Sequence, residues 1–173
     1  AGWQLAEWII DGEPTIDMLG VEPRRYGSYA TKSYLKAKNE EAYANVFTVH
    51  YPDEEREAGR PLRQAPCYDR LKKLGAVFGA KFGWERANFF AKEGEKPEDD
   101  WSFRRSKWFK NVEQECKNVK ENVGLLDMSA FGKCRIKGPG AEEFLDKLVA
   151  NKLPKKIGRI NLCHALNTKG GVH

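Results

Sequence analysis

The sequence has 173 residues, 40% of them hydrophobic and 12% aromatic, which excludes a disordered or low-complexity chain and predicts a globular domain or part of one. Its 30 basic and 25 acidic residues are interleaved, and short basic runs such as 104–107 and 152–156 are typical of a solvated surface. The longest apolar run is far shorter than the roughly 18 residues that a membrane helix needs. We therefore expect neither nucleic acid nor a membrane as a partner.

The first third of the chain predicts two helices and one strand. Residues 1–11 have the apolar spacing of an amphipathic helix, which ends at Gly12. Residues 34–43 are polar enough for a surface helix, and 44–51 alternate and are β-branched like a strand. Residues 54–66 are charged and bounded by prolines, which indicates a loop or linker.

The middle of the chain predicts two further helices around a glycine-rich segment. Residues 68–74 form a short helix that stops at Gly75, and residues 76–83 have glycines where side chains would obstruct a neighbour. Residues 91–100 are the most polar window and predict an exposed excursion. From Trp108 a helical pattern runs up to Gly124, with its apolar stripe at Phe109, Val112, Cys116, Val119 and Val123.

The last part predicts strands around one helix. Residues 125–129 and 133–137 resemble short strands, a turn at 138–140 precedes a helix at 141–151, and 159–166 lead as a strand into a turn at 169–171. The first helix begins almost at the first residue, and the last hairpin is interrupted. We therefore expect the sequence to be a middle part of a longer protein.

The stretch FGWERANFF, residues 82–90, combines a glycine, large aromatic rings and two opposite charges. Gly83 would let the backbone approach a neighbour closely, and a shielded Arg86 would need a partner for its charge. Glu85 is not that partner, because adjacent strand residues point to opposite sides. A structural anchor between two domains is favoured here over a ligand contact.

Residues suited to chemistry are scarce. The four cysteines, Cys67, Cys116, Cys134 and Cys163, form no CxxC pair, and neither a zinc site nor a disulfide framework is expected. His50, His164 and His173 have no metal-ligand spacing and lie beside no nucleophile. The sequence contains no GxGxxG dinucleotide fingerprint. We predict no catalytic residue and no metal ligand.

Three ordered blocks resemble one known family, the flavin-dependent sarcosine and dimethylglycine dehydrogenases and oxidases. GWQLAEWIIDGEP at 2–14 resembles the last helix of their FAD domain. RPLRQAPCYDRLKKLGAVFGAKFGWERANFF at 60–90 resembles their central domain, with the tyrosine-aspartate helix, GAVFG and GWER in that order. VGLLDMSAFGKCRIKGPGAEEFLDKLVANKLPKKIGRINLCHALNTKGGV at 123–172 resembles the start of the aminomethyltransferase domain of the glycine-cleavage T-protein.

The resemblance implies an α+β fold of mixed helices and antiparallel strands, with a central domain and an incomplete folate-binding domain. It divides the chain into the terminal helix of the FAD domain (1–23), the central domain (24–106) and the N-terminal part of the aminomethyltransferase-like domain (107–173). Gly2, Trp3 and the first N–H groups of the initial helix would face the flavin.

The same resemblance places Phe131 and Arg135 at the pterin pocket. It implies that the parent demethylates an N-methylated glycine, with hydride passing to FAD and the one-carbon unit to tetrahydrofolate. The segment alone is expected to be inactive and to bind neither FAD nor tetrahydrofolate tightly, and its partners are the neighbouring FAD and folate domains.

Two alternatives remain open. The chain could be a non-catalytic connector between domains, or part of a T-protein-like methyltransferase, against which the FAD-domain-like helix argues. The resemblance implies a cytoplasmic protein in bacteria and the mitochondrial matrix in animals.

Overall fold

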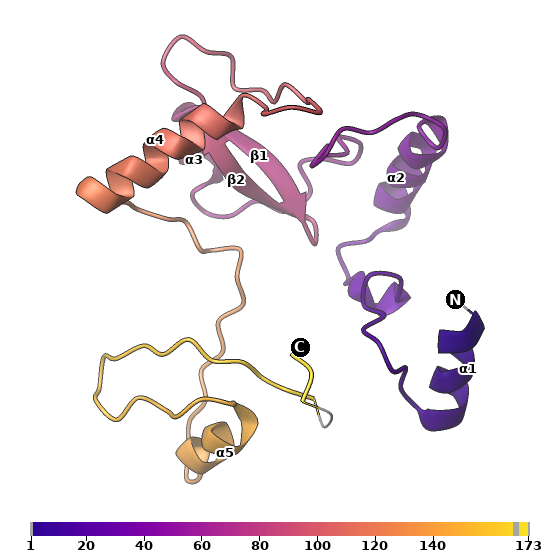
Figure 1. Cartoon of the computed structure of the whole chain (residues 1–173), viewed down its shortest axis with the longest axis vertical. Coiled ribbons are helices and arrows are strands. Elements are labelled where there is room, and N and C mark those ends of the chain that lie inside the picture. Colours follow the sequence, from indigo (N-terminus) through magenta and orange to yellow (C-terminus); the bar gives the residue numbers. More distant parts are fainter. Residues whose placement is uncertain (1, 168–169, 173) are drawn as a thin grey trace. The chain divides into compact units, whose positions relative to one another are not determined.

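The computed structural model describes residues 2–167 and 170–172. Its elements in chain order are α1 (Gly2–Asp11), the 3-10 helix η1 (Pro23–Arg25), α2 (Lys32–Ala44), α3 (Tyr68–Lys73), β1 (Ala76–Lys81), β2 (Trp84–Phe90), α4 (Trp108–Glu121) and α5 (Ala141–Leu148) (Figure 1). Helices together with one antiparallel pair of strands confirm the predicted α+β class. Among the described residues, no helix combines the length and apolar character required to cross a bilayer.

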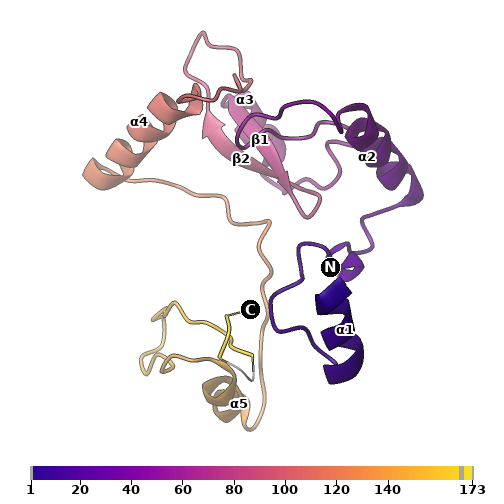
Figure 2. The ribbon, with the colours of Figure 1, turned by 45° about the vertical axis from the view of Figure 1, so that its right-hand side comes forward.

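The chain divides into two compact units, residues 1–131 and 132–173. The first unit contains the hairpin of β1 and β2, with α3 against β1 and α4 against β2 (Figures 1 and 2). The buried apolar residues of the described chain all belong to this unit: Ala65, Ala76, Val77 and Phe89. The hairpin is therefore the centre of the first unit.

The hairpin turns through a two-residue loop, Phe82-Gly83, and both residues have positive φ, 49° and 78°. Such a loop twists in the same sense as the strands, which favours antiparallel pairing. The register pairs Lys81 with Trp84, and an irregularity lies between Val77 and Phe78. An ideal Cβ at Gly83 would lie 2.9 Å from Cδ2 of Tyr29. The close approach predicted for Gly83 is thus confirmed.

The predicted helices form, because their apolar and capping patterns are local. α1 ends at Asp11 before Gly12, and α2 begins after Thr31, whose hydroxyl accepts a hydrogen bond from the Tyr34 N–H at 3.3 Å. Residues 54–66 carry no helix or strand, as predicted.

The apolar stripe predicted for α4 is wrong in its outer half. Cys116 is exposed and Val119 is 60% exposed, whereas Asn111 is buried. The Asn111 amide donates to the Phe90 carbonyl at 2.8 Å, and the Phe90 N–H donates to Glu115 at 3.0 Å. Polar side chains thus attach α4 to the end of β2. The face of α4 that is turned to the hairpin is therefore not the predicted apolar stripe but the face next to it.

The strand predicted at 44–51 is wrong. α2 continues to Ala44, and the segment then turns, with the Asn45 carbonyl accepting from the Thr48 hydroxyl at 2.8 Å. Phe47 and Val49 are 97% and 80% exposed. Alternation produces a strand only where a neighbouring strand is available, and this segment has none among the described residues.

The second unit contains α5 and two isolated antiparallel bridges, Val149 with Ala165 and Leu166 with Val172. The strands predicted at 125–129, 133–137 and 159–166 are absent from the described residues, apart from these single bridges. The helix predicted at 141–151 ends earlier, at Leu148. Lys169 of the predicted final turn and His173 lie outside the described residues.

Candidate functional site

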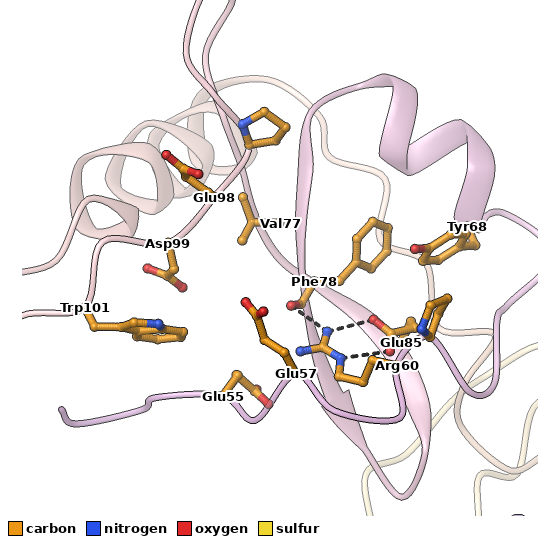
Figure 3. Close-up of a pocket in the computed structure, with 12 residues that line it drawn as sticks. Glu55, Glu57, Arg60, Tyr68, Val77, Phe78, Glu85, Glu98, Asp99 and Trp101 are labelled. Atoms are coloured by element: carbon orange, nitrogen blue, oxygen red, sulfur yellow. Dashed lines mark hydrogen bonds and ion pairs between the residues drawn. The ribbon is translucent and has the colours of Figure 1, made fainter. Parts of the chain in front are cut away.

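A buried ion pair holds the hairpin to the loop that precedes α3. Arg60 donates from Nε to Glu85 Oε1 at 3.0 Å and from Nη2 to Glu85 Oε2 at 2.7 Å. The same Nη2 donates to the Phe78 carbonyl at 2.8 Å (Figure 3). The Arg60 and Glu85 side chains are only 14% and 3% exposed. The hydrogen bonds that Arg60 donates to the Glu85 carboxylate, together with its negative charge, raise the pKa of Arg60, although burial opposes them.

Around this pair lies a cleft of about 470 Å³, which we call the acidic cleft. Its charged lining consists of Arg60 and five carboxylates, and Tyr68, Phe78 and Trp101 add aromatic rings (Figure 3). The carboxylates are Glu55, Glu57, Glu85, Glu98 and Asp99. This excess of negative charge attracts cations and repels anions such as phosphate groups.

Asp99 shows the effect of crowding in the acidic cleft. Burial raises the pKa of its carboxyl, and the neighbouring charges of Asp100, Glu55 and Asp53 raise it further, although a hydrogen bond from the Asp100 N–H lowers it. No group of three or more His, Cys, Asp or Glu side chains among the described residues is placed to hold a metal ion. The described geometry thus gives no metal centre.

A second cleft, of about 190 Å³, lies beside the hairpin within the first unit, and we call it the aromatic cleft. The Arg86 guanidinium lies 4.6 Å from the centre of the Phe131 ring, within the range of a cation–π interaction. Phe131 remains 46% exposed. The other lining residues include Tyr68, Phe78, Phe90, Glu115, Leu125, Leu126 and Met128. An aromatic ring beside a guanidinium fits a planar ligand with a negative or carbonyl-rich edge.

The four residues predicted to contact cofactors occupy different places. Gly2 and Trp3 form the first turn of α1, and Trp3 is 77% exposed, with its indole N–H donating to Glu7. The first turn carries no acidic side chain, so its N–H groups suit an anionic or electron-rich group. Phe131 lines the aromatic cleft of the first unit, whereas Arg135 is exposed and belongs to the second unit.

The interpretation of Arg86 as the shielded charge is wrong. Glu85 is the buried member of this adjacent pair, 5% exposed, and Arg86 is exposed. The two side chains do point to opposite sides of the strand, as expected. Sequence reasoning missed Arg60 as the partner of Glu85. The only available signal was the charge of Arg60 in RPLR, which does not identify a partner 25 residues away.

Comparison with known protein families shows two matches, one after the other along the chain. Residues 67–173 match the GCVT N-terminal domain, and residues 11–65 match the FAD dependent oxidoreductase central domain. The first match covers more than half of the chain, which therefore belongs to the GCVT N-terminal domain family.

Individual relatives match nearly the whole chain. The chain is 42% identical over 173 residues to "Dimethylglycine dehydrogenase, mitochondrial" of Homo sapiens, covering 99% of this chain and 20% of the relative. It is 35% identical over 172 residues to "4-methylaminobutanoate oxidase (formaldehyde-forming)" of Paenarthrobacter nicotinovorans, covering 99% and 21%. It is 34% identical over 177 residues to "Pyruvate dehydrogenase phosphatase regulatory subunit, mitochondrial" of Mus musculus, covering 99% and 20%.

These matches confirm the resemblance to dimethylglycine and sarcosine dehydrogenases. The chain spans about a fifth of the length of the curated relatives that it matches.

Proposed function

We propose that this chain is part of a flavin-dependent enzyme that demethylates an N-methylated glycine of the sarcosine or dimethylglycine type. The supporting observation is the order of the two family matches, central oxidoreductase domain at 11–65 and GCVT N-terminal domain at 67–173, within relatives that cover nearly the whole chain. In the complete protein, FAD would accept the hydride and tetrahydrofolate the one-carbon unit. In animals, we place this enzyme in mitochondria, as the name of the human relative suggests.

The cofactor contacts of this chain are part of the same proposal. Gly2, Trp3 and the adjacent N–H groups of α1 would lie at the flavin, where a helix N-terminus favours negative charge. Phe131 and Arg135 would line the pterin pocket, with Phe131 offering a half-exposed ring face. The division into 1–23, 24–106 and 107–173 remains a proposal, and the two family matches meet elsewhere, between residues 65 and 67.

Anaerobic mixing of the complete protein with candidate amines tests the reaction. Sarcosine or dimethylglycine should bleach the flavin, and added tetrahydrofolate should capture the released carbon. Trimethylglycine is the matched control, because its quaternary nitrogen has no lone pair to assist loss of a hydride. No flavin reduction by any secondary or tertiary N-methylated amine would refute the proposal.

Phe131→Ala separates the folate role from the flavin role in the same assay. We expect flavin reduction at the normal rate and weaker capture of the carbon by tetrahydrofolate. Phe82→Ala is the control, since Phe82 is 51% exposed, close to the exposure of Phe131. Equal carbon capture by both variants would remove Phe131 from the folate site.

A second candidate function is a non-catalytic or regulatory one. The match to a relative named as a regulatory subunit favours it, because that name describes no oxidation. If the complete protein binds no flavin and changes the activity of a partner enzyme instead, this second candidate replaces the first.

A further inference from the structure

Residues 54–63, which we call the strap, are bonded to α2 and to the hairpin, and near their start Glu55 Oε2 accepts from the Ala80 N–H of β1 at 3.3 Å. Toward α2, Glu41 Oε1 accepts from the N–H groups of Glu57 and Ala58 at 2.8 and 2.9 Å. Lys38 Nζ donates to the Arg56 carbonyl at 2.9 Å. These bonds tie the backbone of the strap to two side chains of one helix face.

The last residue of the strap, Arg63, is bonded to the hairpin through its backbone. The Arg63 N–H donates to the Gly83 carbonyl at 2.9 Å, and the Glu85 N–H donates to the Arg63 carbonyl at 2.8 Å. The Arg63 guanidinium lies 4.3 Å from the centre of the Trp84 ring. Together with the buried pair of Arg60 and Glu85, these contacts make the strap a short extra partner for the start of β2.

The two attachments leave almost no free chain between them. Ala58 is the last residue bonded to Glu41, and Arg60 is the first bonded to Glu85. Only Gly59 separates them, and an ideal Cβ there would lie 3.0 Å from Cδ2 of Tyr34 on α2. A displacement at one end of so short a segment is carried to the other.

The strap also connects parts of the chain that match two different family models. The strap and α2 belong to the part that matches the FAD dependent oxidoreductase central domain, whereas Glu85 and the hairpin belong to the part that matches the GCVT N-terminal domain. The buried ion pair is therefore a contact across the border of these two parts.

We propose that the strap couples α2 to the hairpin, so that its two attachments open and close as one unit. The buried Arg60–Glu85 pair attaches the strap to the hairpin, and Glu41 attaches it to α2. Loss of either attachment then loosens both, because a coupling free energy between two sites acts in both directions. The proposal concerns conformation and does not depend on which reaction the complete protein catalyses.

Hydrogen exchange at residue resolution on the full chain tests the coupling. Glu41→Ala, which removes the accepting oxygen, should accelerate exchange at Glu57 and Ala58 directly. It should also accelerate exchange at the amides of Arg63 and Glu85, which bond the strap to the hairpin, by about 5- to 150-fold, the usual range of coupling between sites. Arg60→Gln should show the coupling in the other direction. Breaking the attachment to the hairpin should accelerate exchange at Glu57 and Ala58, at the attachment to α2.

The control is Glu113→Gln, which breaks the exposed pair of Glu113 and Lys117 on α4 and should leave all four amides unchanged. If Glu41→Ala accelerates only Glu57 and Ala58, the two attachments are independent and the proposal is wrong. Equal acceleration throughout α4 would mean general unfolding and also contradict it. If Arg60→Gln does not fold, Arg60→Lys keeps the charge without the two-pronged geometry, and the same comparison decides.

Discussion

At the scale of single residues, Glu85 and Arg60 illustrate what a buried ion pair does. Removing water from two charges costs about as much as their attraction returns, so such a pair adds little net stability. Breaking it is different, because one charge then stays buried without a partner, at a cost of about 3–5 kcal/mol. With the side chain of Glu85 only 3% exposed, the pair functions as a positional lock between loop and hairpin.

Replacing Asp99 should change the stability of the protein by an amount that depends on pH. Burial and the charges of Asp100, Glu55 and Asp53 raise the pKa of its carboxyl in the folded state. The folded state therefore holds the proton more tightly than the unfolded state, and the resulting stabilisation, complete at low pH, disappears as pH rises through the folded pKa. Asp99→Asn should raise the free energy of unfolding at pH 7 by up to about 0.5 kcal/mol, because this side chain is partly exposed.

Urea denaturation at neutral and at acidic pH measures this change in the free energy of unfolding. At pH well below the ordinary carboxyl value of 3.8 both proteins carry a neutral group, so the gain should vanish. Glu98→Gln is the control, since Glu98 pairs with Lys96 on the surface and its loss should bring no gain. A gain for Asp99→Asn that is the same at both pH values would show that charge is not the cause.

At the scale of elements, the hairpin depends on its two-residue turn. Gly83 combines a positive φ of 78° with a neighbouring ring that an added Cβ would meet at 2.9 Å, whereas Gly94 has φ of 82° and open space around it. A side chain at positive φ costs about 1 kcal/mol or more, and crowding adds about 1–3 kcal/mol. Gly83→Ala should thus destabilise by about 2–4 kcal/mol and Gly94→Ala by about 1 kcal/mol.

Thermal and urea unfolding of the two variants measure the difference. The comparison isolates the crowding by Tyr29 and Leu62, because the backbone strain is nearly the same at both glycines. Equal losses in the two variants would mean that the turn tolerates a methyl group and that the close approach is not restrictive.

The elements also show which features the sequence could predict. α1, α2 and α4 follow from residue spacing and capping within a few positions, and all three form. The strand expected at 44–51 depended on a partner that the described chain does not supply, so alternation misled. The prediction of the buried ion pair failed for the same reason. The partner of Glu85 lies 25 residues earlier in the sequence, and no local pattern identifies it.

At the scale of the whole molecule, the cofactor contacts that we propose for this chain would be too few to hold either cofactor. The proposed flavin contacts come from one helix end, and such an end contributes about 0.3–1 kcal/mol toward a negative charge. Micromolar binding requires about 8 kcal/mol. The sequence also lacks the GxGxxG loop that binds a dinucleotide pyrophosphate. Most of the affinity would have to come from residues outside this chain.

We therefore expect titration calorimetry of the 173-residue chain to give no binding of FAD or tetrahydrofolate tighter than about 1 μM. The complete protein that contains this chain, titrated with the same tetrahydrofolate, is the control for the ligand. If the isolated chain binds tetrahydrofolate tightly, the aromatic cleft is sufficient by itself, and Phe131→Ala should then abolish that binding. Tight binding that survives this substitution would locate the folate contacts elsewhere in the chain.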